Sequence, residues 1–132
     1  MSLNSFTFGP QGTTSVYAAL CSDNYMYIYV KVRERYELFR DIHLGKVLQT
    51  KVWHLKNHKT WLTAGTDFLI REWNVSPLAK VPQVGKPLRL HSDLISDCIE
   101  IDNPFAIVTG SLDRSIVMYD LKNEEVLKRF SR

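Results

Sequence analysis

Apolar and polar residues alternate over short stretches along most of the chain. Four such stretches, 25–32, 47–55, 95–101 and 114–119, are rich in β-branched and aromatic residues, and Gly, Pro, Asn or Asp punctuates the sequence around them. Extended over the whole sequence, the pattern predicts twelve β-strands, of which the first two cover 3–8 and 15–20 and the last covers 125–130. We therefore predict an all-β protein.

Two segments differ from this alternation. The longest connection, 76–83, contains Pro77 and Pro82, and we expect it to be a surface loop. Residues 123–129, NEEVLKR, have the composition of a helix, so a terminal helix is the alternative to the last strand.

One pattern occurs three times along the chain. Residues 63–75, TAGTDFLIREWNV, align with 109–121, TGSLDRSIVMYDL: small residues come first, then an aspartate, then an aromatic residue six positions later. Residues 19–31, ALCSDNYMYIYVK, form a weaker third copy. A period in the mid-forties indicates a repeat architecture.

Histidines precede two of the copies. His43 stands 24 residues before Asp67, and His91 stands 22 residues before Asp113. A histidine, an alternating segment, a small-residue strand ending in Asp and then an aromatic-Asp or aromatic-Asn pair resemble the WD40 family, whose blades have four strands. The pair is present here as Trp73-Asn74 and Tyr119-Asp120, and 8–12, FGPQG, are similar to the turn between the first two strands of such blades.

The resemblance implies a partial WD40-type β-propeller with three four-stranded antiparallel blades, at approximately 1–42, 43–90 and 91–132. Propellers typically close a ring of four to eight blades, so this chain alone does not close one. The missing blades would come from the rest of a longer protein or from other subunits.

The resemblance also implies a hydrogen-bonded set in two blades. In the third blade the set is His91, Asp113 and Tyr119, with Thr109 or Ser111. In the second blade it is His43, Asp67 and Trp73, with Thr63 or Thr66. Buried carboxylate and imidazole groups must be paired, so such a set would lock the turn geometry, which is a structural role.

A binding surface is expected where the turns after the blade aspartates meet. Asn24, Phe68 and Arg114 follow the three aspartates directly and would share one rim of the propeller, together with Leu44, Asp93 and Leu94. Aromatic residues and arginine are enriched in protein interfaces, which favours a protein-binding rim. The alternative is that all six are ordinary loop residues.

Composition and charge favour a globular domain over a nucleic-acid-binding protein. The chain has 132 residues, of which 45% are hydrophobic and 23% are charged, as in an ordinary globular domain. The net charge of +3 is spread along the chain, unlike the basic stripe of a nucleic-acid binder. Lysines at 51, 56 and 59 with Trp53 and Trp61 imitate such a stripe, but strand alternation directs both tryptophans toward neighbouring sheets and leaves the lysines in solvent.

Residue patterns give no support to catalysis or to a cofactor. The glycines form neither a dinucleotide fingerprint nor a phosphate loop. His54 and His58 have the spacing of a helical metal pair but no following glutamate, so we interpret them as exposed turn histidines with no metal. Ser111, His91 and Asp113 match a catalytic triad in residue type alone. Cys21 and Cys98 are too few and too scattered for a disulfide framework, so we expect reduced, partly buried thiols.

The expected function is a non-catalytic protein-protein interaction scaffold, with other proteins or additional blades as partners. The alternatives are a nucleic-acid-binding module that uses the lysine-rich edge and a small stand-alone β-sandwich. No apolar run is long enough to span a bilayer and no signal peptide begins the sequence, so we expect a soluble, cytoplasmic protein. Residues 91–121 look most like blades of WD-repeat proteins of cilia and axonemes, which makes that location the finer expectation.

Overall fold

The computed structural model describes residues 3–11, 14–57, 60–76, 78–102 and 105–132, and side chains from residue 16 onward. In these ranges the chain forms twelve β-strands and no helix, which confirms the all-β prediction. Gly12, His58, Lys59 and Pro77, which figure in the sequence interpretation, lie outside the described residues.

The strands form three separate antiparallel sheets, and each sheet takes four consecutive strands in sequence order. The first sheet contains β1 (Leu3–Gln11), β2 (Thr14–Cys21), β3 (Tyr25–Val32) and β4 (Arg35–His43). The second contains β5 (Gln49–Leu55), β6 (Thr60–Gly65), β7 (Ile70–Trp73) and β8 (Gln83–Leu88). The third contains β9 (Ile95–Asp102), β10 (Phe105–Ser111), β11 (Ser115–Asp120) and β12 (Glu125–Ser131). The last segment is thus a strand, and the alternative of a terminal helix is wrong.

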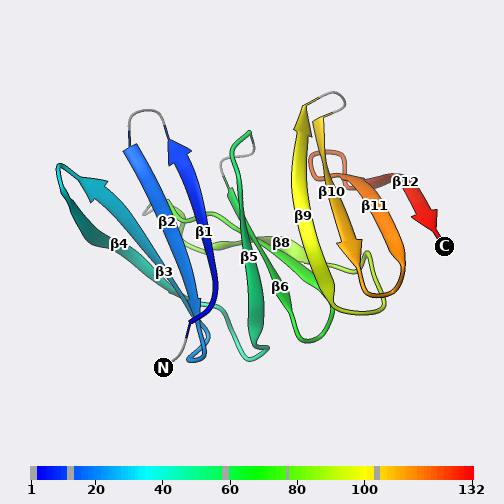
Figure 1. Cartoon of the computed structure of the whole chain (residues 1–132), viewed down its shortest axis with the longest axis horizontal. Helices are drawn as coiled ribbons and strands as arrows, with labels where there is room; N and C mark the ends of the chain where they lie inside the picture. Colours follow the sequence, from blue (N-terminus) through cyan, green and yellow to red (C-terminus); the bar gives the residue numbers. More distant parts are fainter. Residues whose placement is uncertain (1–2, 12–13, 58–59, 77, 103–104) are drawn as a thin grey trace.

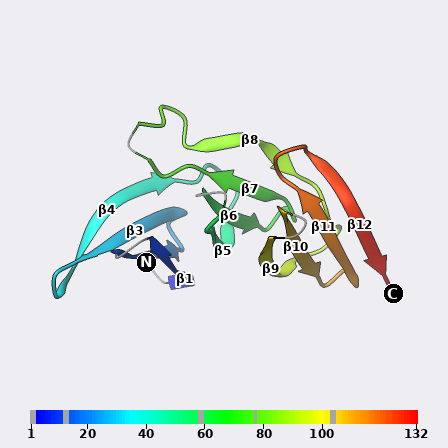
Figure 2. The ribbon, with the colours of Figure 1, turned by 90° about the horizontal axis from the view of Figure 1, so that it is seen from above.

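The sheets stand side by side in the order of the sequence, from blue through green to red in Figure 1. Seen from above, they form an arc in which β1, β5 and β9 lie on the inner side and β4, β8 and β12 on the outer side (Figure 2). The arc is open, and the described residues do not close a ring. Three sheets in this order also differ from the two facing sheets of a β-sandwich.

Two hydrophobic cores hold the arc together, one in each space between neighbouring sheets. The core between the first and second sheets contains Val16, Ala18, Leu20, Met26, Ile28, Ile42, Leu44, Val52, Trp61 and Trp73. The core between the second and third sheets contains Leu55, Leu62, Ala64, Ile70, Leu90, Ile95, Cys98, Ile107, Val117 and Tyr119. The second sheet is therefore covered on both faces, and all six residues of β6 are buried.

The first and third sheets each leave one face uncovered. On β11, Val117 is buried in the second core, whereas its neighbour Ile116 points to the opposite face and is 48% exposed. Ile116 pairs across the sheet with Phe130, which is 49% exposed. On the first sheet, the face that alternates with the first core carries Tyr17 and its cross-strand neighbour Tyr29. Isolated soluble sheets rarely leave apolar faces of this kind in water.

Candidate functional site

The turn between the second and third strands has the same backbone in all three sheets. Asn24, Phe68 and Arg114 occupy equivalent places in it, with left-handed φ values of 63°, 68° and 69°. The amide of each donates to the carbonyl three residues earlier, at 3.0, 3.1 and 3.3 Å. This is the hairpin turn that ends on a left-handed residue, and it reverses the chain within one short loop.

The aspartate before each left-handed residue stabilises the same turn. Oδ1 of Asp23, Asp67 and Asp113 accepts a hydrogen bond from the amide two residues later, at 3.3, 3.2 and 2.9 Å. Asp and Asn side chains that accept a hydrogen bond from the backbone amide two residues later are typical of such turns. The repeat seen in the sequence is therefore also a repeat of hydrogen bonding.

A buried network surrounds the aspartate of the third sheet. The Nδ1 atom of His91 lies 3.1 Å from Asp113 Oδ2 and 2.8 Å from Ser115 Oγ, and its Nε2 lies 2.8 Å from Thr109 Oγ1. The His91 side chain has no exposed surface. We assign its proton to Nδ1, because Nδ1 can then donate toward Asp113 while Nε2 accepts from the Thr109 hydroxyl.

The carboxylate of Asp113 also accepts hydrogen bonds from other donors. The amide of Ser92 donates to Oδ2 at 3.0 Å, and the hydroxyl of Ser115 donates to Oδ1 at 2.6 Å. Burial raises the pKa of Asp113, but the hydrogen bonds from Ser115 and Ser92 and the proximity of His91 outweigh burial, so the pKa lies well below its ordinary range. The charged carboxylate is the form that this turn requires.

In the second sheet other residues stabilise the aspartate of the turn, and the hydrogen-bonded set expected around His43 does not form. His43 is the exposed last residue of β4; its Nδ1 accepts from the amide of Gly45, and its ring contacts Tyr25. Asp67 pairs instead with Arg71, at 2.8 Å. The hydrogen bond from Arg71, together with the backbone amide of Leu69, outweighs the opposing effect of burial and holds the pKa of Asp67 below its ordinary range.

Gln49 is the residue that sequence reasoning missed. It is fully buried at the start of β5, where Thr63 Oγ1 donates to its Oε1 at 2.7 Å. Trp73 Nε1 in turn donates to Thr63 Oγ1 at 2.8 Å, so Trp73 and Thr63 do belong to a buried set, with Gln49 in place of the histidine. The space is tight, because a Cβ atom on Gly65 would lie 2.7 Å from Gln49 Nε2.

The remaining members of the expected sets have other surroundings. Tyr119 is buried in the second core, 7% exposed, and does not share a hydrogen bond with His91 among the described contacts. Ser111 donates to the carbonyl of Leu94 at 2.9 Å and accepts from the amide of Asp113. The exposed Thr66 donates through its amide to the carbonyl of Leu48.

Two of the six expected rim residues are structural. Asn24 binds the loop that connects the first two sheets: its Nδ2 donates to the carbonyls of Gly45 and Val47, and its Oδ1 accepts from the amide of Gln49. Leu44 is only 3% exposed and belongs to the first core. Leu44 is therefore inaccessible to a partner, and the loop occupies the side-chain amide of the half-buried Asn24.

The other four rim residues remain at the surface to different extents. Arg114 and Leu94 are exposed, whereas Phe68 and Asp93 are half-buried. The amide of Leu112 donates to the carbonyl of Leu94, which holds Leu94 beside the turn that carries Arg114. The rim of the third sheet is therefore the accessible part of the predicted surface.

Among the described residues of the lysine-rich edge, Trp61 is buried and Trp53 is half-buried. Lys51 and Lys56 are exposed, but Trp61 lies in the first core and Trp53 packs against the second. Trp53 Nε1 also lies 3.3 Å from Asp97 Oδ1. Both tryptophans face neighbouring sheets as predicted, so neither offers a stacking surface for bases.

His54 differs from its prediction. It lies on β5, half-buried against the ring of Trp61, and its Nε2 is buried without a hydrogen-bond partner among the described residues. Burial, opposed by Glu100, lowers its pKa. Within the described residues no group of His, Cys, Asp or Glu side chains could hold a metal ion. Cys21 and Cys98 are free and buried.

No protein-family model matches the sequence, and no match is found among curated proteins. The described part of the chain also contains no helix that could cross a membrane.

Proposed function

We propose that this chain is part of a WD40-type β-propeller that acts as a non-catalytic scaffold for protein-protein interaction. The observation that carries the proposal is the repetition of one unit: three consecutive four-stranded sheets with the same aspartate-stabilised turn, arranged on an arc with their first strands inside (Figure 2). The buried His91–Asp113–Thr109 network has the composition that the WD40 resemblance implies for a blade.

The uncovered faces support a larger ring. Each internal core joins opposite faces of two successive sheets, so the open face of the third sheet corresponds to faces that the first and second sheets bury. Sheets of the same kind, from a longer protein or from other subunits, are the natural cover for both open faces. Closure would also remove the exposed apolar area around Ile116 and Phe130.

Catalysis is a poor use of the buried network. A general base must reach the proton that it abstracts, and the His91 side chain has no exposed surface. Both of its ring nitrogens already contact groups of the same turn or of β10. We therefore assign this network to the stability of the blade.

The proposed partners are proteins that bind the rim around Leu94 and Arg114, both of which are exposed. The resemblance of 91–121 to WD-repeat proteins of cilia and axonemes supports a cytoplasmic, ciliary or axonemal scaffold as the finer form of the proposal.

Sedimentation velocity and chemical unfolding test the proposal together. The isolated chain should associate or should lack a cooperative unfolding transition, because two blade faces remain in water. Addition of the remaining blades or subunits should give one compact particle with a single transition. A compact 15.3 kDa monomer that unfolds cooperatively by itself would overturn the proposal.

A further inference from the structure

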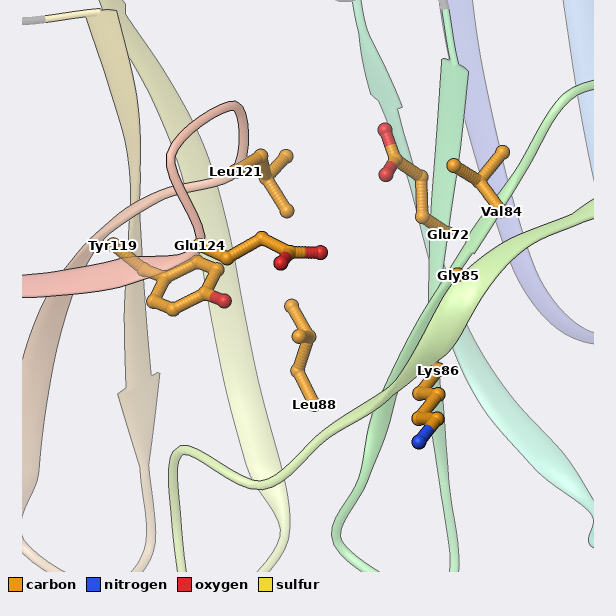
Figure 3. Close-up of a pocket in the computed structure, with 8 residues that line it drawn as sticks. All are labelled: Glu72, Val84, Gly85, Lys86, Leu88, Tyr119, Leu121 and Glu124. Atoms are coloured by element: carbon orange, nitrogen blue, oxygen red, sulfur yellow. The ribbon is translucent and has the colours of Figure 1, made fainter.

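The two junctions between neighbouring sheets use equivalent faces. At the first junction Met26, three residues after its turn aspartate, shares a core with Trp73, six residues after the next one. At the second junction Ile70 and Tyr119 have the same positions and share the second core. Figure 3 shows Glu72, two residues after Ile70, on one side of this junction and Tyr119 on the other. Each junction is therefore defined by position relative to the turn aspartates.

The open face of the third sheet is equivalent to a face that the first sheet buries. Ile116 follows its turn aspartate by three residues, as Met26 does. Ile116 pairs across the sheet with Phe130. Met26 pairs in the same way with Ile42. The first of these pairs is exposed, whereas the second is buried in the first core. The third sheet thus presents a junction face that the chain itself does not cover.

Arg132 lies at one end of this face. Its amide donates to the carbonyl of Arg114 at 3.2 Å. The amide of Leu44 donates to the carbonyl of Asn24 at 3.0 Å in the same place of the first sheet. Arg132 therefore takes the position of Leu44, which is buried in the first core. An open hollow of about 480 Å³ has Arg132 in its lining and leaves room for side chains of a facing sheet. An arginine that becomes buried there needs a carboxylate partner.

The open face of the first sheet is rich in tyrosine. Tyr17 stands six residues before the turn aspartate, and Tyr29 stands six residues after it. The second sheet has Trp61 and Trp73 at these positions, and both are buried in the first core. Tyrosine offers a large, rigid contact area and is enriched in protein interfaces. Five of the six tyrosines lie on this tyrosine face: Tyr17, Tyr25, Tyr27, Tyr29 and Tyr36.

Carboxylates lie on the tyrosine face toward the end that corresponds to Arg132. Asp41 is exposed and pairs with Tyr27 across β3 and β4. The hydroxyl of Tyr27 donates to Asp23 Oδ2 at 2.6 Å, so both carboxylates lie beside this tyrosine. The turns that carry Asp23 and Arg114 lie at the same end of the arc (Figure 1). The two open faces therefore carry opposite charges at the same end.

The number of sheets indicates what covers the two faces. Propellers typically close with about four to eight blades, and this chain contributes three sheets. Two copies give six sheets, and six is the only multiple of three in that range. Head-to-tail contacts between identical subunits close a ring only when their rotation returns to the start, and otherwise they form a filament. Two copies related by a two-fold axis leave no open face.

We infer that a second copy of this chain closes the ring. The open face of the third sheet of each copy packs on the tyrosine face of the other copy. Ile116 of one copy meets Tyr29 of the other, and Arg132 of one copy lies beside Asp41 of the other. The inference rests on the proposed function, because a ring of such sheets gives the two open faces a common use.

Sedimentation equilibrium of the 132-residue chain tests the number of copies. We expect one particle with twice the 15.3 kDa mass of the chain, which dissociates on dilution and forms no larger species. A series of larger masses that grows with concentration would overturn the closed pair, because it indicates an open head-to-tail filament.

Charge-reversal variants test which faces meet. Arg132→Asp and Asp41→Arg should each weaken association about tenfold or more, because each places like charges opposite one another at both contacts of the pair. An equimolar mixture of the two variants should restore association, because every contact of the mixed pair again joins opposite charges. Lys80→Asp, which makes the same change of charge as Arg132→Asp in the exposed β7–β8 loop, should associate like the wild type.

The mixture separates contact between copies from damage within one copy. A variant that merely misfolds is not rescued by a second misfolded variant. Unweakened association of Arg132→Asp and Asp41→Arg, no recovery in the mixture, or an equal loss with Lys80→Asp would each contradict the inferred contact.

The two proposals fail in distinguishable ways. A compact monomer that unfolds cooperatively would remove both the propeller and its second copy. A chain that forms a defined particle only after other blades are added would keep the propeller and remove the second copy.

Discussion

Two buried threonines show how one structural requirement is met by different side chains. Thr63 and Thr109 are fully buried on the second strands of their sheets. Thr109 Oγ1 contacts His91 Nε2, whereas Thr63 Oγ1 donates to Gln49 and accepts from Trp73. A buried hydroxyl must find a partner, but a histidine, an amide or an indole can supply it. The fold therefore requires that each buried threonine hydroxyl has a hydrogen-bond partner, but it does not require one particular residue type as that partner.

Coupling between His91 and Asp113 is the first prediction at this scale. Asp113→Asn should destabilise the assembled protein by about 1–3 kcal/mol, because the amide nitrogen that replaces one carboxylate oxygen cannot accept a hydrogen bond, whether it takes the place of Oδ2 beside Ser92 or of Oδ1 beside Ser115. In a double-mutant cycle with His91→Ala, the two losses should fall short of additivity by about 0.5–3 kcal/mol. Denaturant unfolding of the four proteins measures this difference.

The second sheet provides the matched control for that cycle. Asp67→Asn and His43→Ala should be additive, because Asp67 pairs with Arg71 and His43 is exposed at the end of β4. Coupling as large for this pair as for the third sheet would show that the cycle does not report the buried network.

Acid should destabilise the turn of the third sheet, which is the second prediction. The folded pKa of Asp113 lies below the ordinary value of about 3.9, so its contribution is fully present above that value and is lost as the pH falls below it. Asp67, held by Arg71, shifts in the same direction. The stability of Asp113→Asn should therefore depend less on pH than that of the wild type between about pH 5 and pH 2. Parallel pH profiles of the two proteins would contradict this prediction.

At the scale of elements, the position relative to the aspartate determines the backbone conformation of each turn, whereas the neighbouring loop determines which contacts the side chains make. The spacing from each aspartate determines that Asn24, Phe68 and Arg114 share one left-handed position. What each side chain does depends on the neighbouring loop: the loop before β5 passes over Asn24 and takes its three side-chain hydrogen bonds. Arg114 remains exposed.

This division explains how far the sequence could be used. Strands and turns follow from the alternation of apolar and polar residues, and the repeat groups the strands in fours. The assignment of four consecutive strands to each sheet was therefore predictable. The role of Gln49 was not predictable from the sequence. Gln49 lies at the position that Ile95 occupies in the third sheet, and only its contact with Thr63 on the next strand gives the polar side chain a role. The one signal was the two extra residues between His43 and Asp67. The burial of His54 likewise depends on Trp61 across the hairpin.

Glycine at two equivalent turn positions should have opposite consequences, which is the third prediction. Arg114→Gly should leave stability unchanged or raise it by up to about 1 kcal/mol, because glycine adopts the left-handed conformation without strain. Asn24→Gly should destabilise by about 1–3 kcal/mol, because the loss of three side-chain hydrogen bonds outweighs the same relief. Thermal and denaturant midpoints distinguish the two, and an equal effect at both positions would show that Asn24 does not hold the loop.

At the scale of the molecule, the two ends of the arc differ from its centre. The second sheet is stabilised by cores on both sides, whereas the first and third each have one core and one open face. The rim follows the same order: its accessible residues, Leu94 and Arg114, belong to the third sheet. Binding and assembly are therefore both tested best on that sheet.

Partner capture through the rim is the fourth prediction. Leu94→Ala combined with Arg114→Ala should reduce the recovery of a protein partner from the native source. The melting temperature should stay nearly unchanged, because exposed substitutions usually change stability by less than about 0.5 kcal/mol. Leu78→Ala with Lys80→Ala, in the exposed β7–β8 loop, is the control pair and should not reduce recovery. Equal recovery with both pairs, or a large fall in melting temperature, would show that the rim is ordinary or buried surface.

Assembly through the open face of the third sheet is the last prediction. Ile116 and Phe130 are paired neighbours on that face, and Ile99 on β9 extends it with 57% of its surface exposed. Ile116→Lys would place a charge where another sheet must pack, and burial of an unpaired charge is strongly unfavourable. The particle mass measured by sedimentation should therefore fall. Leu78→Lys, at a residue that is 92% exposed in the β7–β8 loop, adds the same charge away from both open faces and should assemble normally. If Ile116→Lys assembles as fully as Leu78→Lys, this face is solvent-exposed in the native protein and the proposed ring does not continue from the third sheet.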